Sequence, residues 1–259
     1  MMLIDTHCHL DFPEFEPDRE KVIEKAREEG VVCIINVGTD ADSTEKCLVL
    51  AEKYDNCFAT AGIHPHQASK MKDAHLDRLS QLAREGKIVA IGETGLDYHY
   101  GREYLSCQKD LFRFHINLAT ELNLPLIVHQ RESQDDVVRI LQESNLQVSV
   151  IFHCFSGDRL ILQYAWENHF YCSFAGNITF KSAEPIREAA RSLPESLLMV
   201  ETDAPYLSPE PYRGKRNEPG RVKLVAEALA AVREEEPERM FTLLFRNAID
   251  FFRLKEKGF

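Results

Sequence analysis

Several features that mark membrane proteins and secreted proteins are missing from this sequence. No apolar run approaches the roughly 18–20 residues that a membrane span requires. The amino terminus lacks a basic region followed by a long apolar stretch, so we see no signal peptide. The seven cysteines include no Cys-x-x-Cys pair, which favours reduced, buried thiols over a disulfide framework or a zinc knuckle. We therefore expect a cytoplasmic protein that makes no membrane contact.

An excess of positive charge is also missing. The chain carries 31 Lys and Arg against 42 Asp and Glu, a formal net charge of −11, which argues against a surface that wraps long nucleic acid by charge alone. A local basic pocket is still compatible with this negative net charge. The length of 259 residues is compatible with one barrel-sized domain over residues 1–259. We expect a monomer without an obligate protein partner.

Two histidines follow the first apolar run of the chain. Residues 2–4 are apolar and lead into Asp5-Thr6-His7-Cys8-His9. In a strand, successive side chains alternate between faces, so His7 and His9 point to one face and Cys8 to the other. Neutral imidazoles on a rigid element are common metal ligands. The pattern therefore indicates half of a metal site, the alternative being two polar residues where a strand meets a loop.

Apolar runs of strand length alternate with amphipathic segments of helical length along the whole chain. Buried parallel strands are expected at residues 2–4, 31–37, 57–61, 88–91, 124–128, 148–152, 170–174 and 197–200. Helices are expected at residues 18–29, 43–54, 74–85, 103–122, 133–143, 159–167, 183–192, 221–233 and 237–253. Ser133 and Asp136 have the spacing of a helix cap. Eight strand–helix units favour an α/β fold of the (β/α)8 TIM-barrel type, and a doubly wound open sheet is the competing architecture.

The barrel interpretation requires that chemistry lie where the strands end, at their carboxyl ends. Ionisable residues follow the expected strands at these points: His64, Glu93, His129, His153, Glu201 and Asp203. They would be costly inside a hydrophobic run, and all fall at one end of the predicted barrel. His75, His115 and His169 lie in or beside helical segments, where we expect surface or interhelix polar residues.

Seven ordered motifs resemble one known family. They are His7-x-His9, Gly-Ile-His-Pro-His around His64, Gly-Glu-Thr-Gly-Leu-Asp-Tyr around Glu93, His129, His153-Cys-Phe-Ser-Gly, Glu201-Thr-Asp-Ala-Pro and Arg216-Asn-Glu-Pro. Together they resemble the TatD family of metal-dependent hydrolases and deoxyribonucleases, a branch of the amidohydrolase-like metal barrels. The resemblance spans residue 3 to about residue 250, without a departure at any expected ligand position.

The resemblance implies two divalent metal ions. One would be bound by His7, His9 and Asp203, and the second by His129 and His153, with Glu93 bridging the two. Imidazole and carboxylate ligands without thiolate suit Zn²⁺, Mn²⁺, Co²⁺ or Mg²⁺ rather than a closed structural zinc site. The identity of the metal stays open.

A metal-dependent hydrolysis follows from this ligand set. Water held at the metals would lose a proton near neutral pH, and Asp203 is our candidate for the general base that accepts it. Glu201 lies two residues earlier on the same strand face. We interpret it as a residue that orients a ligand histidine.

Predictions of the substrate contacts are less specific. We expect His64, Arg131, Ser156, Arg216 and Asn217 around the mouth, with Arg216 and Asn217 in the loop Arg213-Gly-Lys215-Arg216-Asn217. These residues would form a local cationic patch for a phosphodiester end. Tyr98 and Tyr206 could stack on a base. For all except His64, a solvated loop residue is an equally good interpretation.

Two hypotheses of function remain. The first is a phosphodiesterase, most simply a deoxyribonuclease of the 3′–5′ exonuclease type that acts on the ends of single-stranded DNA. The alternative is a hydrolase of C–N or C–O bonds in an amide or ester on a small-molecule or acyl substrate, because fold alone does not determine substrate.

Overall fold

A computed structural model describes residues 2–99, 101 and 103–257 of the chain. Strands and helices alternate along it, and the contacts between residues divide it into two compact units. Unit 1 comprises Met1–Asn36 and Cys154–Phe259, and unit 2 comprises Val37–His153.

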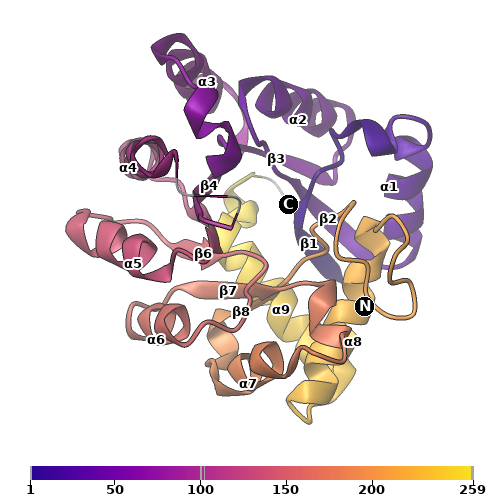
Figure 1. Cartoon of the computed structure of the whole chain (residues 1–259). Coiled ribbons are helices and arrows are strands. Elements are labelled where there is room, and N and C mark those ends of the chain that lie inside the picture. Colours follow the sequence, from indigo (N-terminus) through magenta and orange to yellow (C-terminus); the bar gives the residue numbers. More distant parts are fainter. Residues whose placement is uncertain (1, 100, 102, 258–259) are drawn as a thin grey trace. The chain divides into compact units, whose positions relative to one another are not determined.

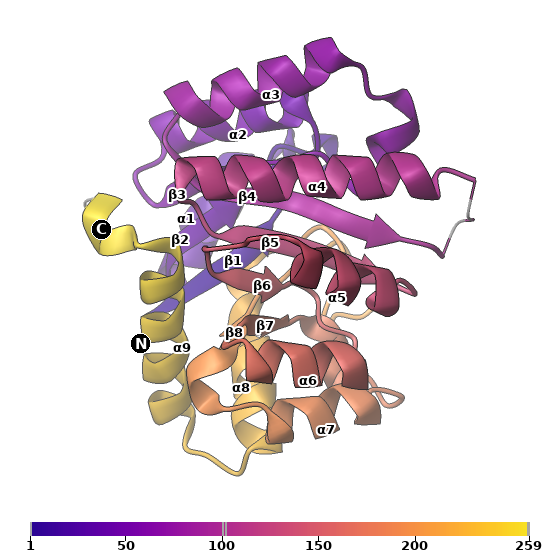
Figure 2. The same ribbon diagram turned by 90° about the vertical axis from the view of Figure 1, so that its left-hand side faces the viewer.

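Unit 2 contains four parallel strands with helices between them. The strands β3 (Cys57–Ala61), β4 (Ile88–Asp97), β5 (Leu126–Arg131) and β6 (Val150–Phe152) pair in this order. The helices are α2 (Ala41–Lys53), α3 (Asp73–Glu85), α4 (Leu105–Leu122) and α5 (Gln134–Glu143). In Figure 1 these helices lie together on one side of the unit's strands. Figure 2 shows α4 running along β4, which it contacts.

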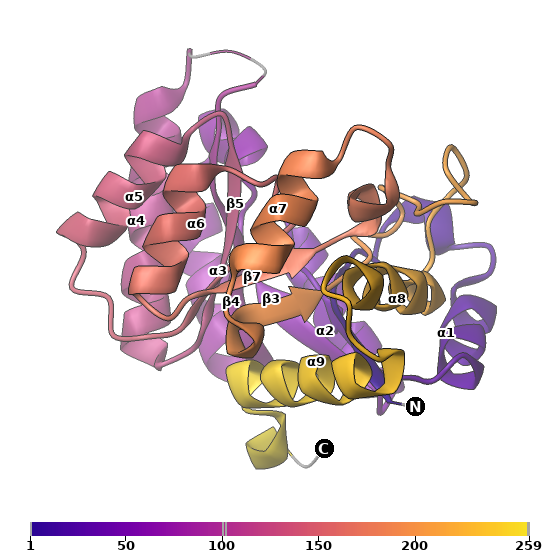
Figure 3. The ribbon, with the colours of Figure 1, turned by 90° about the horizontal axis from the view of Figure 1, so that it is seen from below.

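Unit 1 also contains four strands with helices between them. Its strands are β1 (Leu3–Cys8), β2 (Val31–Asn36), β7 (Tyr171–Phe174) and β8 (Leu198–Val200), with helices α1 (Arg19–Glu28), α6 (Arg159–Glu167), α7 (Glu184–Ser192), α8 (Val222–Val232) and α9 (Pro237–Phe252). β1 pairs in parallel with β2, and β7 with β8. A parallel bridge between Cys8 and Ala204 joins the end of β1 to the segment that follows β8. Figure 3 shows α8 and α9 side by side, and α9 contacts both β1 and β8.

Local sequence signals explain where several helices begin and which face they bury. The carboxylates of Asp40 and Asp158 accept the amide hydrogens of Ser43 and Ile161, so they cap α2 and α6. In α5, Val137 and Ile140 are fully buried on one stripe, and each such side chain contributes about 1.5–3 kcal/mol. Ser133 precedes α5 as predicted, but the predicted capping hydrogen bond is absent. Its hydroxyl donates to the carbonyl oxygen of Leu96 at 2.8 Å instead.

The predicted fold class is confirmed. Eight parallel strands, in the order in which they occur in the chain, alternate with helices, as in a (β/α)8 TIM barrel. The main difference lies at the carboxyl ends of β1, β4 and β5. These strands continue to Cys8, Asp97 and Arg131, beyond the apolar runs, because polar residues at the strand ends interrupt the hydrophobic signal but keep the strand's hydrogen bonds. Within the described residues, no helix is long and apolar enough to cross a membrane.

Candidate metal centre

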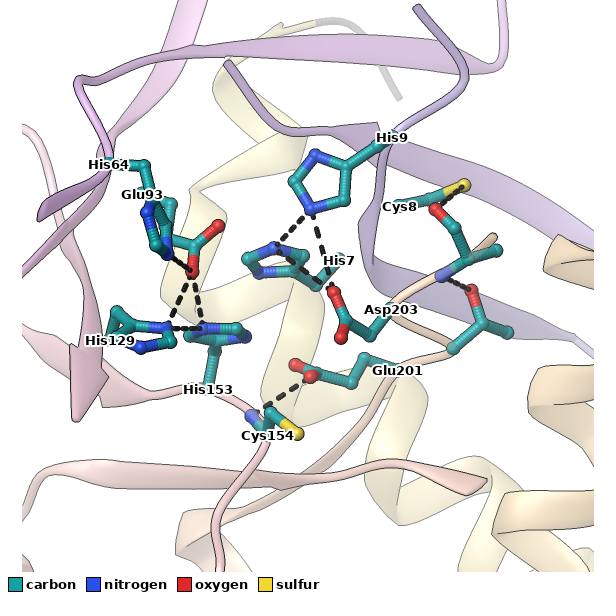
Figure 4. Close-up of polar contacts among 12 residues, drawn as sticks. His7, Cys8, His9, His64, Glu93, His129, His153, Cys154, Glu201 and Asp203 are labelled. Atoms are coloured by element: carbon teal, nitrogen blue, oxygen red, sulfur yellow. Dashed lines mark hydrogen bonds and ion pairs between the residues drawn. The ribbon is translucent and has the colours of Figure 1, made fainter. Parts of the chain in front are cut away.

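Unit 1 brings together two histidines and one aspartate at the ends of β1 and β8. The Nε2 atoms of His7 and His9 are 3.2 Å apart, as expected for side chains on one face of a strand. Asp203 Oδ1 lies 3.5 Å from His9 Nε2 and 3.9 Å from His7 Nε2. Figure 4 shows the three side chains pointing toward one another. We call His7, His9 and Asp203 the β1/β8 group.

Backbone hydrogen bonds fix this group. The amide of Asp203 donates to the carbonyl of His7 at 2.9 Å, and the amide of His9 donates to the carbonyl of Ala204 at 2.8 Å. Asp203 has a φ of +54°, in the left-handed region that Asp tolerates better than most residues. The segment after β8 therefore continues alongside β1, which aims the Asp203 carboxylate at the two imidazoles.

Asp5 secures the same junction, and no role was predicted for it. It is fully buried and accepts the backbone amide of Thr202 at 2.8 Å and the Thr202 hydroxyl at 2.5 Å. Burial raises the pKa of Asp5 to about 8, although the Thr202 hydrogen bonds oppose the shift. Strand alternation places Asp5 on the face of His7 and His9, which is the signal that could have found it.

Glu201 and Asn217 bind backbone near this group. Glu201 accepts the amide of Cys154 at 2.9 Å and the hydroxyl of Ser173. Figure 4 shows the contact with Cys154. Asn217 is buried, and its Nδ2 donates to the carbonyl of Thr202 at 2.8 Å. Asn217 therefore holds the loop after β8 in place.

Unit 2 gathers three imidazoles around one carboxylate oxygen. Glu93 Oε1 lies 2.9 Å from His129 Nδ1, 2.8 Å from His153 Nε2 and 3.4 Å from His64 Nε2. His129 Nδ1 and His153 Nε2 are themselves 3.2 Å apart. Figure 4 shows the rings converging on Glu93, which lies in β4. We call these four residues the Glu93 group.

A glycine allows β4 and β5 to approach each other at this point. Gly95 has a φ of +136°, and a Cβ atom on it would lie 2.1 Å from the carbonyl oxygen of His129. Such a φ strains residues that have a side chain. Gly95 thus lets the backbone that carries His129 lie directly beside β4.

The Glu93 group favours an anionic carboxylate. Burial alone would raise the pKa of Glu93, but the imidazoles of His153 and His64 and the hydrogen bonds from His129 and His153 hold this pKa well below its usual value. Burial lowers the pKa of His64 to about 3 against the opposing effect of Glu93, so this imidazole is neutral near pH 7. Burial opposes protonation of His129 too, but its hydrogen bonds to Asp97 and Glu93 raise its pKa.

Asp97 joins this group through His129, and no role was predicted for it. Its Oδ2 lies 3.1 Å from His129 Nε2 and 2.9 Å from His66 Nε2, and its Oδ1 accepts the amide of His99 at 2.9 Å. A carboxylate only accepts hydrogen bonds, so Nε2 of His129 donates to Asp97. With this proton on Nε2, Nδ1 of a neutral His129 ring is the nitrogen that can bind a cation. The Asp97 carboxylate therefore fixes which nitrogen His129 presents to Glu93.

The Glu93 group has the donors of a divalent cation site. In the Glu93 group, two imidazole nitrogens 3.2 Å apart face one carboxylate oxygen, and the ligand atoms of His64, Glu93 and His129 lie within 4.8 Å of one another. Nitrogen and oxygen donors without thiolate suit Zn²⁺, Mn²⁺ or Mg²⁺. Cys8, next to two of the histidines, directs its Sγ at the carbonyl of Ala204 at 3.8 Å. This contact agrees with the strand alternation that places Cys8 on the opposite face from His7 and His9.

The predicted substrate contacts differ in their surroundings. His64 lies in the Glu93 group, whereas Arg131 and Ser156 are exposed. The Arg216 guanidinium makes two 2.8 Å contacts with the Asp18 carboxylate and lies 4.9 Å from the centre of the Phe15 ring. Arg216 is thus already neutralised by a neighbouring carboxylate.

The fold and these donor groups are those of a metal-dependent hydrolase, and comparison with known proteins identifies the family. The family model described as TatD related DNase matches residues 4–253. The uncharacterized metal-dependent hydrolase YabD of Bacillus subtilis is 41% identical over 254 residues, covering 98% of this chain and 100% of the relative. YcfH of Escherichia coli, also named an uncharacterized metal-dependent hydrolase, is 37% identical, covering 98% and 97%.

A solved structure agrees. The crystal structure of YjjV, a TatD homologue from Escherichia coli, superimposes with a TM-score of 0.89 at 33% identity and covers 97% of this chain and 98% of its own. The chain belongs to the TatD family of metal-dependent hydrolases.

Proposed function

We propose that this protein hydrolyses phosphodiester bonds in DNA, at the ends of single strands and in the 3′–5′ direction. The observation that carries the proposal is the convergence of three imidazoles on Glu93 Oε1, at 2.8–3.4 Å, in a chain whose family model is described as TatD related DNase. A carboxylate oxygen surrounded by imidazole nitrogens is a donor set that suits a divalent cation.

In this proposal the six ligands are those expected from the sequence: His7, His9 and Asp203 for one ion, His129 and His153 for the other, and Glu93 for both. Active-site residues of (β/α)8 enzymes gather at the carboxyl ends of the strands. His9, His64, His153 and Asp203 lie just beyond such ends, whereas Glu93 lies within β4. When bound, the two ions would lower the pKa of a coordinated water and neutralise charge that develops on the phosphate.

The side chains of the protein divide the remaining tasks. Asp203 accepts the proton of the attacking water through its carboxylate, which is partly exposed at 15%. His64, neutral near pH 7, donates a hydrogen bond to a phosphate oxygen rather than an ionic contact. Arg131, exposed at the end of β5, would contact the strand backbone. Glu201 keeps the backbone beyond His153 in place through the amide of Cys154.

The test uses metal-free protein and single-stranded DNA labelled at either the 3′ or the 5′ end, with Mg²⁺, Mn²⁺ or Zn²⁺ added back. Stepwise shortening from the 3′ end that requires metal is expected. Asp203→Asn should reduce the rate at least 100-fold, because a general base contributes about 10²–10⁴-fold. Asp135→Asn, at an exposed position of α5, is the matched control and should retain full activity.

Two outcomes would contradict this proposal. Retained turnover in a folded Asp203→Asn variant would remove Asp203 from the role of base. Failure of a folded, metal-loaded protein to cleave DNA, together with hydrolysis of an amide or carboxylic ester, would favour the alternative hydrolase.

A further inference from the structure

A cavity of about 480 Å³ opens beside the segment that follows Asp203, within unit 1. Its lining includes Pro205, Tyr206, Phe180, Arg213 and Lys215. Binding pockets for small ligands have volumes of about 300–1,000 Å³, so this one has the size for a nucleotide. We propose that it binds the nucleotide next to the scissile phosphate, with Arg213 and Lys215 holding a phosphate group and Tyr206 stacking on a base.

The charges that line the cavity favour an anionic ligand. In the described part of the chain, neither Arg213 nor Lys215 has a carboxylate within ion-pair distance. Arg213 lies over the Phe180 ring, 4.4 Å from its centre, and the Lys215 ammonium lies 5.8 Å from the centre of the Tyr212 ring. Arg216, in the same loop, is instead bound to Asp18. Two cations without a carboxylate partner, in a chain with net charge −11, suit an anionic ligand supplied from outside.

Ring contacts connect the cavity to the β1/β8 group. The His9 ring stacks on Phe12, with centres 4.7 Å apart, and Phe12 makes an edge contact with Tyr206 at 6.3 Å. Tyr206 is 52% exposed and lines the cavity. A flat, accessible ring beside unpaired cations is the arrangement that single-strand binders use to hold a base and its phosphate.

The backbone supports a fixed position for this loop. The Ser208 hydroxyl donates to the carbonyl of Lys215 at 2.6 Å, and Arg221 donates to the carbonyl of Arg216 at 2.5 Å. Arg216 also donates a hydrogen bond to the backbone carbonyl of Glu14 at 2.7 Å, which ties the loop to the segment before α1. Glu14 itself lines the cavity. The cationic side chains are therefore carried by a braced loop.

This inference rests on the proposed function. It keeps the predicted base contact of Tyr206 and assigns the phosphate contact in its loop to Arg213 and Lys215 instead of Arg216. Binding is measured with the metal-loaded protein, a short fluorescent oligothymidylate with phosphorothioate linkages and fluorescence anisotropy across a range of salt. Arg213→Ala/Lys215→Ala should weaken binding at least tenfold. It should also reduce the slope of log K against log salt by about 0.7, because the two cations neutralise one phosphate and each neutralised phosphate of a single strand contributes about 0.7.

Matched variants separate these roles from loss of charge. Lys87→Ala/Arg246→Ala removes two exposed cations elsewhere, from the residue preceding β4 and from α9, and should leave affinity and salt slope unchanged. Tyr206→Ala should weaken binding about tenfold, while Tyr206→Phe, which keeps the ring, should bind like the parent. Hydrolysis of bis(4-nitrophenyl) phosphate, a diester without a flanking nucleotide, should fall less than DNA cleavage in the Arg213→Ala/Lys215→Ala variant and should be unchanged in Lys87→Ala/Arg246→Ala.

The outcomes separate the two proposals. If the parent cleaves DNA but the Arg213→Ala/Lys215→Ala variant binds with unchanged affinity and salt slope, the cavity is not the nucleotide site and the proposed function stands. An equal loss of bis(4-nitrophenyl) phosphate hydrolysis would also overturn the inference, because it would indicate damage to the reaction centre. If the parent neither binds nor cleaves DNA, the proposed function fails and this inference fails with it.

Discussion

Asp97→Asn tests whether a carboxylate outside the predicted ligand set controls metal binding. The substitution keeps the size of the side chain but replaces one acceptor oxygen with an NH₂ group. In the parent, Asp97 Oδ2 faces both His129 Nε2 at 3.1 Å and His66 Nε2 at 2.9 Å. If the amide presents its NH₂ group to His129, Nε2 must accept, and the proton moves to Nδ1. That is the nitrogen 2.9 Å from Glu93 Oε1.

Substitution of the hydrogen-bond partner of a ligand histidine typically costs 10–100-fold in metal affinity or activity. We expect a loss in this range for the ion assigned to His129 and His153, equivalent to about 1.4–2.8 kcal/mol. The dissociation constant is measured by competition with a chromophoric chelator, alongside kcat/KM on end-labelled DNA. Loss of the carboxylate charge contributes in the same direction, because Asp97 is an anion whose pKa lies below its usual value, held there against burial by His129 and the amide of His99.

His66→Ala is the matched control. It removes the other imidazole from Asp97 Oδ2, leaves the contact with His129 intact and should change metal affinity less than twofold. Wild-type affinity in Asp97→Asn would refute the proposed orientation of His129. An equal loss in both variants would show that the whole hydrogen-bond cluster matters, not the tautomer of His129.

Two further predictions concern stability. His115 is fully buried, and burial lowers its pKa to about 4, compared with about 6.5 in an unfolded chain. Between these two pH values the unfolded state binds more protons than the folded state. The free energy of unfolding therefore falls as the pH drops from 6.5 to 4. From pH 7 to pH 5 this loss is about 2 kcal/mol; urea unfolding at both pH values should show it in the parent but not in His115→Gln, and equal losses in both would contradict it. Gly95→Ala should destabilise by about 3 kcal/mol or more, because its Cβ would meet the His129 carbonyl. Gly214→Ala, also at positive φ but with open space around it, should cost only about 1–2 kcal/mol; equal unfolding free energies in the two variants would rule out the close approach.

The sequence was sufficient for the order of the elements and for the fold. Strands that are buried on both faces are near-continuous apolar runs, and helices on such a sheet bury one stripe, so both signals are local. For this reason predicted and observed bounds of most helices agree within two residues, as for α5 and α6. Strand alternation likewise placed His7 and His9 on one face, where the structure has them.

Features that depend on contacts distant in sequence could not be predicted in this way. His115 was expected to be a surface or interhelix residue, but it is buried in α4, where its Nε2 accepts the amide of Ile63 at 3.0 Å. The substrate contact of Arg216 stays a prediction, but the sequence did not indicate that its guanidinium binds Asp18, which precedes it by 198 residues. Asp97 was visible in its motif, but only the pairing of β4 with β5 shows that it lies beside His129.

The β1/β8 group shows why residue type alone leaves a role undecided. Asp5, Asp203 and Asn217 are all polar residues in or beside the same motifs, and all lie near the end of β1 or β8. Asp5 and Asn217 are fully buried, and both bind Thr202. The Asp5 carboxylate accepts the amide and the hydroxyl of Thr202, and the Asn217 side chain donates to the Thr202 carbonyl. They therefore hold the backbone that precedes Asp203. Asp203 instead keeps a partly exposed carboxylate directed at two imidazoles. Burial and hydrogen-bond partners, rather than polarity, therefore distinguish the residues that support the site from the one proposed to carry its chemistry.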